Sequence, residues 1–233
     1  MRRLVGTVLV LALLAGGVVV ADVVARRVAE QRVAAAVTQA VTVTGSPQVR
    51  IQESTPFLLQ LVRGSVDSLD VSLAGAQLQG LAVTDVHVTA ADVAVAAPHR
   101  TGHVTADGVL PTATVQQVLQ QRTGLDATLS VEGGALRATA KLLGLDLVVT
   151  LTPRVDAGRL LVDVSGLTLG GRAIQPSTLP ASIRQTLSGL EVPVTGLPQG
   201  LVLTGAQVVP AGVHVTLVGD GVVASSSSAA PGA

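Results

Sequence analysis

The sequence reads Ser68-Leu69-Asp70-Val71-Ser72-Leu73 over one short stretch, in which apolar side chains alternate with polar ones. A period of two predicts a β-strand with one apolar face and one solvated face. The same alternation returns in segments that begin at Leu81, Val86, Leu136, Leu145, Leu160, Leu201 and Val213. Glycine, proline or Asp-Gly pairs separate these segments at short intervals, which is typical of an antiparallel meander. Ala157-Gly158 and Ala211-Gly212 have the composition of hairpin turns.

Helical patterns precede and interrupt the strands. Residues 22–43 are predicted to form one long helix, in which Val33, Val37 and Val41 recur every four residues. A short helix is expected to open at Thr114 with a capping box and close at Gly124, and a second lies at residues 180–189. These two helices share similar strings of residues. The similarity indicates either a diverged internal repeat or simply the same local order of a helix followed by a strand. The fold class is therefore α+β.

The composition restricts the classes of function. The 233 residues include one aromatic side chain, Phe57, and no cysteine, while 48% are hydrophobic and 13% are charged. The formal net charge is zero, and no basic run exceeds a short arginine pair. Nucleic acid is therefore not an expected partner. The absence of cysteine excludes disulfides and thiolate catalysis.

The N-terminus indicates export. Arg2-Arg3 precede an apolar run from Leu4 to Ala21. Its length lies between that of a signal-peptide core and a membrane span. We therefore expect residues 1–21 to be a signal peptide or a membrane anchor, 22–223 a single α+β domain, and 224–233 a disordered tail. The protein would lie in the cell envelope or periplasm.

Side chains suited to catalysis are few. His99 and His103 are separated by a predicted loop and lack an acidic or cysteine partner, so no metal site is expected. Asp67 and Asp70 flank strand residues, and no nucleophile elbow or phosphate-binding loop is present. No cofactor and no enzymatic activity are predicted. An envelope glycolipid-processing enzyme is the weakest alternative; it would depend on Asp67, Asp70 or His87.

The most prominent feature of the predicted strands is apolar surface. Several segments are aliphatic on one face and nearly uncharged on the other. They would form either an ordinary filled core or a curved sheet whose aliphatic face holds acyl chains. Each buried methylene contributes about 0.8 kcal/mol, so one long chain would contribute roughly 10 kcal/mol before ordering costs.

Two motifs carry a resemblance to a known family. Residues 56–64, Pro-Phe-Leu-Leu-Gln-Leu-Val-Arg-Gly, lead into the alternating stretch, and residues 197–201, Leu-Pro-Gln-Gly-Leu, precede the last two strand segments. Together they resemble the actinobacterial LmeA family of phospholipid-binding proteins over roughly residues 22–223. The resemblance implies a tubular-lipid-binding type of fold, with a curved antiparallel sheet wrapped around the long helix. It also implies an envelope protein of lipid or lipoglycan transport or maturation, without catalytic residues.

These observations lead to one hypothesis with one alternative. We expect a non-catalytic protein with phospholipid and a membrane surface as partners; its oligomeric state stays open. Arg63 is the candidate for a phosphate contact, against the alternative of an ordinary solvated arginine. The alternative function is a membrane-anchored scaffold protein with a filled core. The residues expected to line or gate the acyl groove are Phe57, Leu58, Leu61, Val37 and Val41.

Overall fold

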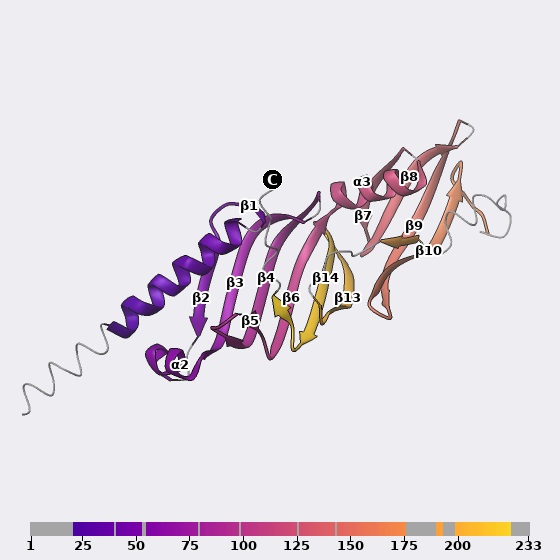
Figure 1. The fold of residues 1–233 in the computed structure, drawn as a ribbon. Coiled ribbons are helices and arrows are strands. Elements are labelled where there is room, and N and C mark those ends of the chain that lie inside the picture. Colours follow the sequence, from indigo (N-terminus) through magenta and orange to yellow (C-terminus); the bar gives the residue numbers. More distant parts are fainter. Residues whose placement is uncertain are drawn as a thin grey trace, which may run out of the picture.

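A computed structural model describes most of the chain and confirms an α+β architecture built of antiparallel sheets (Figure 1). The described residues are 21–39, 41–52, 55–78, 80–97, 99–124, 126–142, 144–175, 190–192 and 199–224. Several predictions fall outside these ranges: the export segment, the helix at 180–189 with the possible repeat that includes it, and nearly all of the tail.

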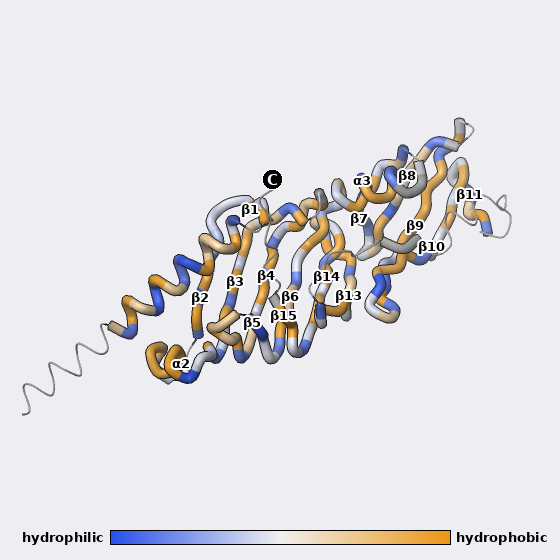
Figure 2. The backbone as a smooth tube through the Cα atoms, in the orientation of Figure 1, coloured by the Kyte–Doolittle hydropathy of each residue, from blue (hydrophilic) through white to orange (hydrophobic). Residues whose placement is uncertain are grey.

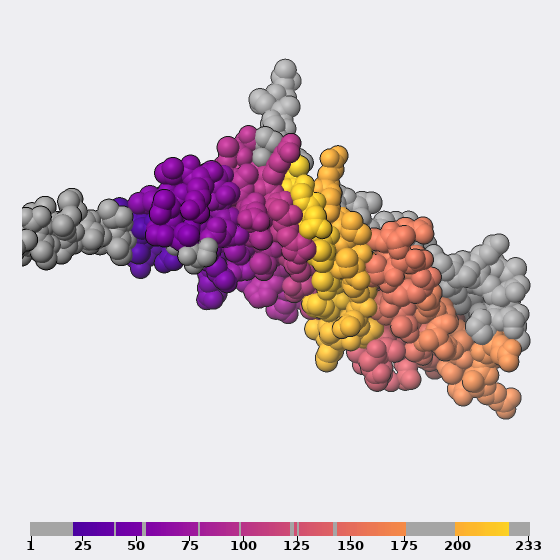
Figure 3. All heavy atoms as spheres, turned by 90° about the horizontal axis from the view of Figure 1, so that it is seen from below, coloured from indigo at the N-terminus to yellow at the C-terminus, as the bar shows by residue number. Residues whose placement is uncertain are grey.

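A seven-stranded sheet forms the N-terminal part of the molecule. Its order is β1-β3-β4-β6-β14-β13, and β2 also pairs with β3. The C-terminal hairpin β13–β14 therefore completes a sheet whose other strands come from the first half of the chain (Figure 3). The strands are β1 (Thr42–Thr44), β2 (Gln48–Gln52), β3 (Ser65–Leu78), β4 (Leu81–Ala94), β6 (His103–Pro111), β13 (Leu201–Val209) and β14 (Gly212–Asp220).

A second, six-stranded sheet continues the molecule away from the first. Its order is β11-β10-β9-β8-β7, and β12 also pairs with β10. Its strands are β7 (Ala127–Glu132), β8 (Ala135–Leu142), β9 (Leu145–Asp156), β10 (Arg159–Leu169), β11 (Arg172–Ala173) and β12 (Leu190–Val192). A small two-stranded sheet joins β5 (His99–Arg100) to β15 (Val223–Ala224).

The main hydrophobic core lies where the two sheets meet. Ten of its thirteen buried residues come from β7–β10, and the other three are Leu203, Val213 and Val215 of the C-terminal hairpin. Helix α3 (Thr112–Thr123) packs on this core through Val115 and Leu119. Such interdigitated aliphatic packing is what holds a sheet without aromatic residues together.

The N-terminal helix covers residues 21–39, and the amide of Val41 still donates to the carbonyl of Val37. The prediction of a sheet wrapped around this helix is not confirmed. Instead, the helix lies beside β2 at the open edge of the sheet, where Glu30 Oε1 accepts the backbone N–H of Ile51 at 3.1 Å (Figure 1). A side chain that occupies a free strand amide protects that edge from pairing with another chain. No helix within the described ranges is both long and apolar enough to span a bilayer.

Two local predictions were wrong. Residues 81–94, predicted to be broken by turns, form the single strand β4, in which Asp85 and Asp92 take positive φ values of 50° and 52°. Helix α3 begins at residue 112 without a side-chain cap, and the Thr114 hydroxyl donates instead to the carbonyl of Ala82 at 3.1 Å. The end of this helix at Gly124 and the hairpin at Ala157-Gly158 are confirmed.

Candidate functional site: a two-faced sheet and its open edge

The strands β2, β3, β4 and β6 form a sheet with one aliphatic face. Their register places side chains directly opposite one another in rows that cross all four strands. Two of these rows contain only aliphatic residues, because the alternation of each strand is in phase with that of its neighbours. We call these rows the aliphatic face; they are Val49–Val71–Val88–Ala106 and Ile51–Leu69–Ala90–Val104.

The aliphatic face has little core packed against it. The buried cluster on this side consists of Ala90, Val104 and Val222, and Ile51 and Val71 of the aliphatic face are also buried. The core at the junction of the sheets, by contrast, has thirteen buried members. Val49, Leu69 and Val88 stay only half-buried. The second half of the protein therefore has a filled core, and the first half presents aliphatic surface without an equivalent described layer over it.

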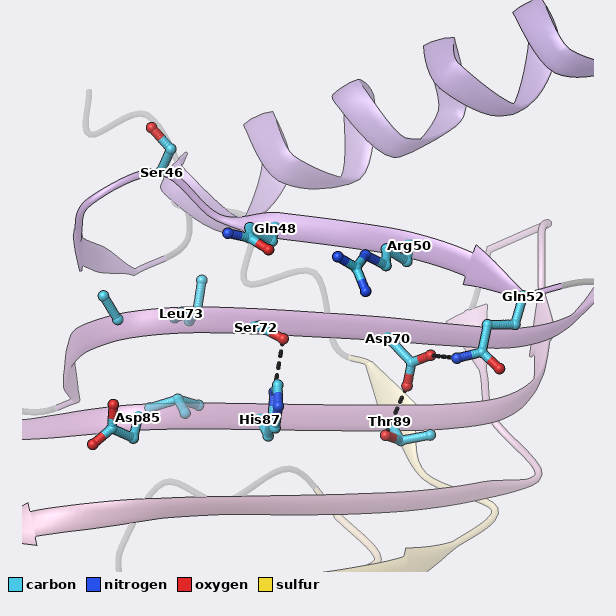
Figure 4. Close-up of a pocket in the computed structure, with 12 residues that line it drawn as sticks. Ser46, Gln48, Arg50, Gln52, Asp70, Ser72, Leu73, Asp85, His87 and Thr89 are labelled. Carbon is cyan, nitrogen blue, oxygen red and sulfur yellow. Dashed lines mark hydrogen bonds between the residues drawn. The ribbon is translucent and has the colours of Figure 1, made fainter.

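The opposite face of the same strands is polar and hollowed (Figure 4). The groove has a volume of about 620 Å³, and its lining includes Arg50 of β2, Asp70 and Ser72 of β3, and His87 and Thr89 of β4. Asp70 accepts hydrogen bonds from Thr89 at 2.8 Å and from the amide of Gln52. Ser72 Oγ and His87 Nδ1 lie 2.7 Å apart.

Arg50 is the side chain of this groove best suited to hold an anion. It stands directly opposite Asp70 in the register of β2 and β3. Both carboxylate oxygens of Asp70 are engaged by Gln52 and Thr89, however, and no ion pair of Arg50 forms within the described residues. A guanidinium with open donors binds phosphate oxygens well.

A second groove, of about 370 Å³, runs between the N-terminal helix and β2. Its lining includes Arg27, Glu30 and Gln31 of the helix and Gln48 and Arg50 of the strand. Glu30 uses one carboxylate oxygen to accept the backbone N–H of Ile51. Val49, a member of the aliphatic face, also lines it. This edge groove therefore joins two arginines to the margin of the aliphatic face.

Helix α2 (Phe57–Arg63) contains four of the six predicted site residues. Phe57 is buried, with 1% of its surface exposed, and Leu58 is half-buried. Leu61 and Arg63 are exposed, and Arg63 occupies the last turn of the helix. Phe57 therefore packs inside the protein, and nothing in its position separates a structural plug from a gate.

Gln60, on the same helix, fastens α2 to the sheet. It is 1% exposed; its side-chain amide donates to the carbonyl of Thr55, and its Oε1 accepts the N–H of Asp67, both at 2.8 Å. At the start of the helix, Asp22 Oδ1 accepts the N–H of Leu58 at 2.8 Å. The start of the N-terminal helix and the start of α2 therefore lie side by side.

The remaining two predicted residues lie elsewhere. Val37 and Val41 are half-buried at the far end of the N-terminal helix. At 1.5 Å of rise per residue, Val37 lies roughly 22 Å from Asp22 and hence from α2. The six residues thus do not form one site; their roles in lipid binding stay a prediction.

The histidines examined for metal binding lie in different strands. His99 belongs to β5, and His103 starts β6, where its Nδ1 lies 2.7 Å from Asp220 Oδ1. Within the described part of the chain, no three metal-ligating side chains come together.

Sequence reasoning missed the two arginines of the edge groove. Arg50 was overlooked because β2 is only five residues long and was not recognised as a strand. The alternation Gln48-Val49-Arg50-Ile51-Gln52 was the available signal, since it places all three polar side chains on one face. The role of Arg27 depends on the helix lying at the sheet edge, which no local pattern reveals.

Comparison with known proteins identifies a family. The model of a family described as LmeA-like phospholipid-binding matches residues 20–218 of the 233. No curated protein and no solved structure matched the chain. The match covers the helix, both sheets and the edge groove, so the chain belongs to the LmeA-like phospholipid-binding family.

Proposed function

We propose that this protein is an exported, non-catalytic phospholipid-binding protein of the cell envelope that holds acyl chains against the aliphatic face. The observation that carries the proposal is the pair of aliphatic rows across β2, β3, β4 and β6, with no equivalent of the main core packed on them. An acyl chain needs apolar area and no directional partners, and a smooth surface of valine, leucine and alanine supplies such area.

The edge groove is the proposed position of the lipid headgroup. Arg27 and Arg50 line it together, and Val49 connects it to the aliphatic face. A phosphate between two guanidinium groups would form charge-assisted hydrogen bonds while its acyl chains lie on the adjoining aliphatic surface. Arg63, the phosphate contact expected from the sequence, lies on α2 outside this groove.

The chemistry of the polar groove supports a non-catalytic role. Ser72, His87 and Asp107 face one another across β3, β4 and β6, which superficially resembles a catalytic triad. These residues lie within paired strands, where backbone amides are largely engaged in the ladder and do not converge to stabilise an oxyanion. His87 and Thr89 are also exposed, so the groove does not exclude water.

Localisation in the envelope rests on residues 1–21. Two arginines followed by an apolar run to Ala21 have the pattern of a signal peptide or an anchor. Transport or maturation of lipids or lipoglycans is the biological setting we propose.

The test measures bound phospholipid in the wild-type protein and in variants that change one face of the sheet at a time. Protein purified from its native membrane should carry phospholipid detectable by native mass spectrometry. Val88→Asn places an amide on the aliphatic face and should lower phospholipid occupancy. The matched Thr105→Asn changes a polar-face position of β6, opposite Thr89 and outside the groove lining, and should retain occupancy. Wild-type protein without phospholipid adducts, or equal occupancy in the two variants, would overturn the proposal.

A further inference from the structure

An apolar tip is present at the end of the molecule where the chain emerges from residues 1–20. Nine large hydrophobic side chains are exposed among the described residues, and six of them lie on α2, just after β4, or on the first turns of the N-terminal helix. Scattered single exposures are normal, but several on neighbouring elements at one end of a molecule indicate a contact surface. We call this group the α2 tip; its members are Leu59, Leu61, Val62, Val95, Val24 and Val28.

Backbone and side-chain contacts hold the parts of the α2 tip together. The N–H of Val95 donates to the carbonyl of Gly64, directly after α2, at 2.9 Å. The carboxylate of Asp22 caps the N–H of Leu58. Val62 is 87% exposed, so its side chain projects outward with almost no protein around it. Figure 2 shows α2 as a predominantly hydrophobic segment, and Figure 3 shows it at the outer surface of the N-terminal end.

The charges around the α2 tip favour an anionic partner. The N-terminal helix and α2 carry four arginines and two acidic residues within their described ranges. Both acids, Asp22 and Glu30, accept backbone N–H groups. Asp67 also lies beside α2, because its N–H donates to Gln60. The guanidinium groups of Arg26, Arg27 and Arg63 form no ion pair in the described part of the chain. Basic residues that flank an apolar patch are typical of proteins that dock on anionic membranes.

The position of the chain outside the described residues identifies the partner. The N-terminal helix begins at residue 21, next to α2, and the preceding residues contain the apolar run that starts at Leu4. An apolar segment of that kind enters the bilayer. The α2 tip is therefore the part of the domain that lies nearest the membrane while this segment is attached.

We propose that the α2 tip is a membrane-docking surface that inserts Leu59 and Val62 into the interface of a bilayer containing anionic phospholipid. The inference rests on the proposed phospholipid-binding function and adds where the lipid enters. Arg27 lies five residues after Asp22, or roughly 7.5 Å along the helix. Docking through the tip would therefore hold the mouth of the edge groove at the depth of the headgroups.

The absence of cysteine makes a site-specific test possible. The full-length chain carrying Val62→Cys is labelled with an environment-sensitive nitrobenzoxadiazole probe and reconstituted with vesicles of phosphatidylcholine and phosphatidylglycerol. A matched protein carries the label at Leu145→Cys, an aliphatic position exposed by 49% on the second sheet. Doxyl-labelled phosphatidylcholine in the same vesicles quenches only probes that reach the acyl region.

We expect a blue shift and strong quenching at position 62, neither effect at position 145, and weaker quenching at 62 in vesicles of phosphatidylcholine alone. Adding Leu59→Ser should reduce the quenching at position 62. A probe at 62 that stays in water, or equal quenching at both positions, would overturn docking through the tip. A probe at 62 that is already shielded before vesicles are added would show that a second copy of the chain covers the tip, which also overturns it.

Native mass spectrometry of the same preparations separates this proposal from the proposed function. Phospholipid adducts with an unquenched probe at position 62 would reject the docking surface and leave lipid binding intact. A quenched probe without adducts would support docking and reject lipid binding by the domain.

Discussion

Phe57→Ala separates the two roles that the buried aromatic side chain of α2 can have. Phe57 is 1% exposed, and it belongs to the same short helix that Gln60 fastens to the sheet. Truncating a buried phenylalanine to alanine costs about 3–5 kcal/mol, since it removes apolar contacts and leaves a cavity. If Phe57 is a structural plug, the variant should lose that amount of unfolding free energy.

The expected change is large enough to measure by thermal unfolding. In a domain of this size, 1 kcal/mol shifts Tm by about 2–4 °C, so the loss corresponds to about 6–20 °C. The chain has no Trp or Tyr, so unfolding must be followed by far-ultraviolet circular dichroism rather than intrinsic fluorescence. Phe57→Leu is the control, because it keeps most of the apolar volume and should retain most of the stability.

Native mass spectrometry of the same variants completes the experiment. A plug predicts that Phe57→Ala lowers Tm while phospholipid occupancy, measured well below the transition, stays as in the wild type. An unchanged Tm together with lost phospholipid would refute the reasoning and assign the side chain to the acyl groove. The Phe57→Leu variant should then retain lipid in proportion to the volume it preserves.

Three further experiments test the local structure. Gly212→Ala should prevent stable folding, since φ is +152° and the new Cβ would lie 2.0 Å from the carbonyl oxygen of Leu110. Gly64→Ala is the control: no atom lies within 4 Å of its new Cβ, so it should lower the free energy of unfolding in urea by only about 1 kcal/mol. Gln60→Ala should cost about 1–3 kcal/mol for each backbone group it leaves unpaired, and wild-type stability would show that water replaces the side chain. Asp22→Ala removes the side chain that caps α2 and should speed amide hydrogen exchange in that helix. Asp22→Asn keeps an acceptor and should not. Equal exchange rates in the two variants would contradict a capping role for Asp22.

The sequence predicted the fold where periodicity and turn chemistry agree. Between Ser68 and Leu73 of β3 and between Leu136 and Leu142 of β8, apolar and polar residues alternate regularly. Ala157-Gly158 was identified as a hairpin from its composition, and in the structure both residues adopt the positive φ that the tight turn requires.

The predicted strand boundaries were wrong where residues typical of turns lie inside strands. The Asp107-Gly108 pair lies within β6, although it has the composition of a turn. Glycine is needed there because a Cβ would come within 2.9 Å of Val83 Cγ1 on the neighbouring strand. Asp85 marks an irregularity in the β4–β6 pairing that local sequence cannot distinguish from a turn. Only the tertiary neighbours decide between these possibilities.

The sequence predicted which types of residue form the candidate site, but not which positions they occupy. An aliphatic strand face and an arginine were the expected ingredients, and the arginine chosen from sequence was Arg63. Arg50 is the better candidate, because the register sets it opposite an already satisfied Asp70 and the helix brings Arg27 to the same groove. Both features follow from pairings between segments that are distant in sequence, whereas Arg63 was selected for its neighbours along the chain.

The two halves of the protein also explain how an apolar surface can remain available in a stable molecule. A sheet that buried both rows of the aliphatic face against its own helix would gain stability and lose the surface that an acyl chain needs. Here the thirteen-residue core at the junction of the sheets supplies the packing, and β14 of the C-terminal hairpin connects that core to β6 through a continuous register. The N-terminal helix meanwhile uses Glu30 to occupy the edge of β2. The fold thus secures its edge and its core at positions outside the aliphatic rows, which is the arrangement expected when the face between them serves a ligand.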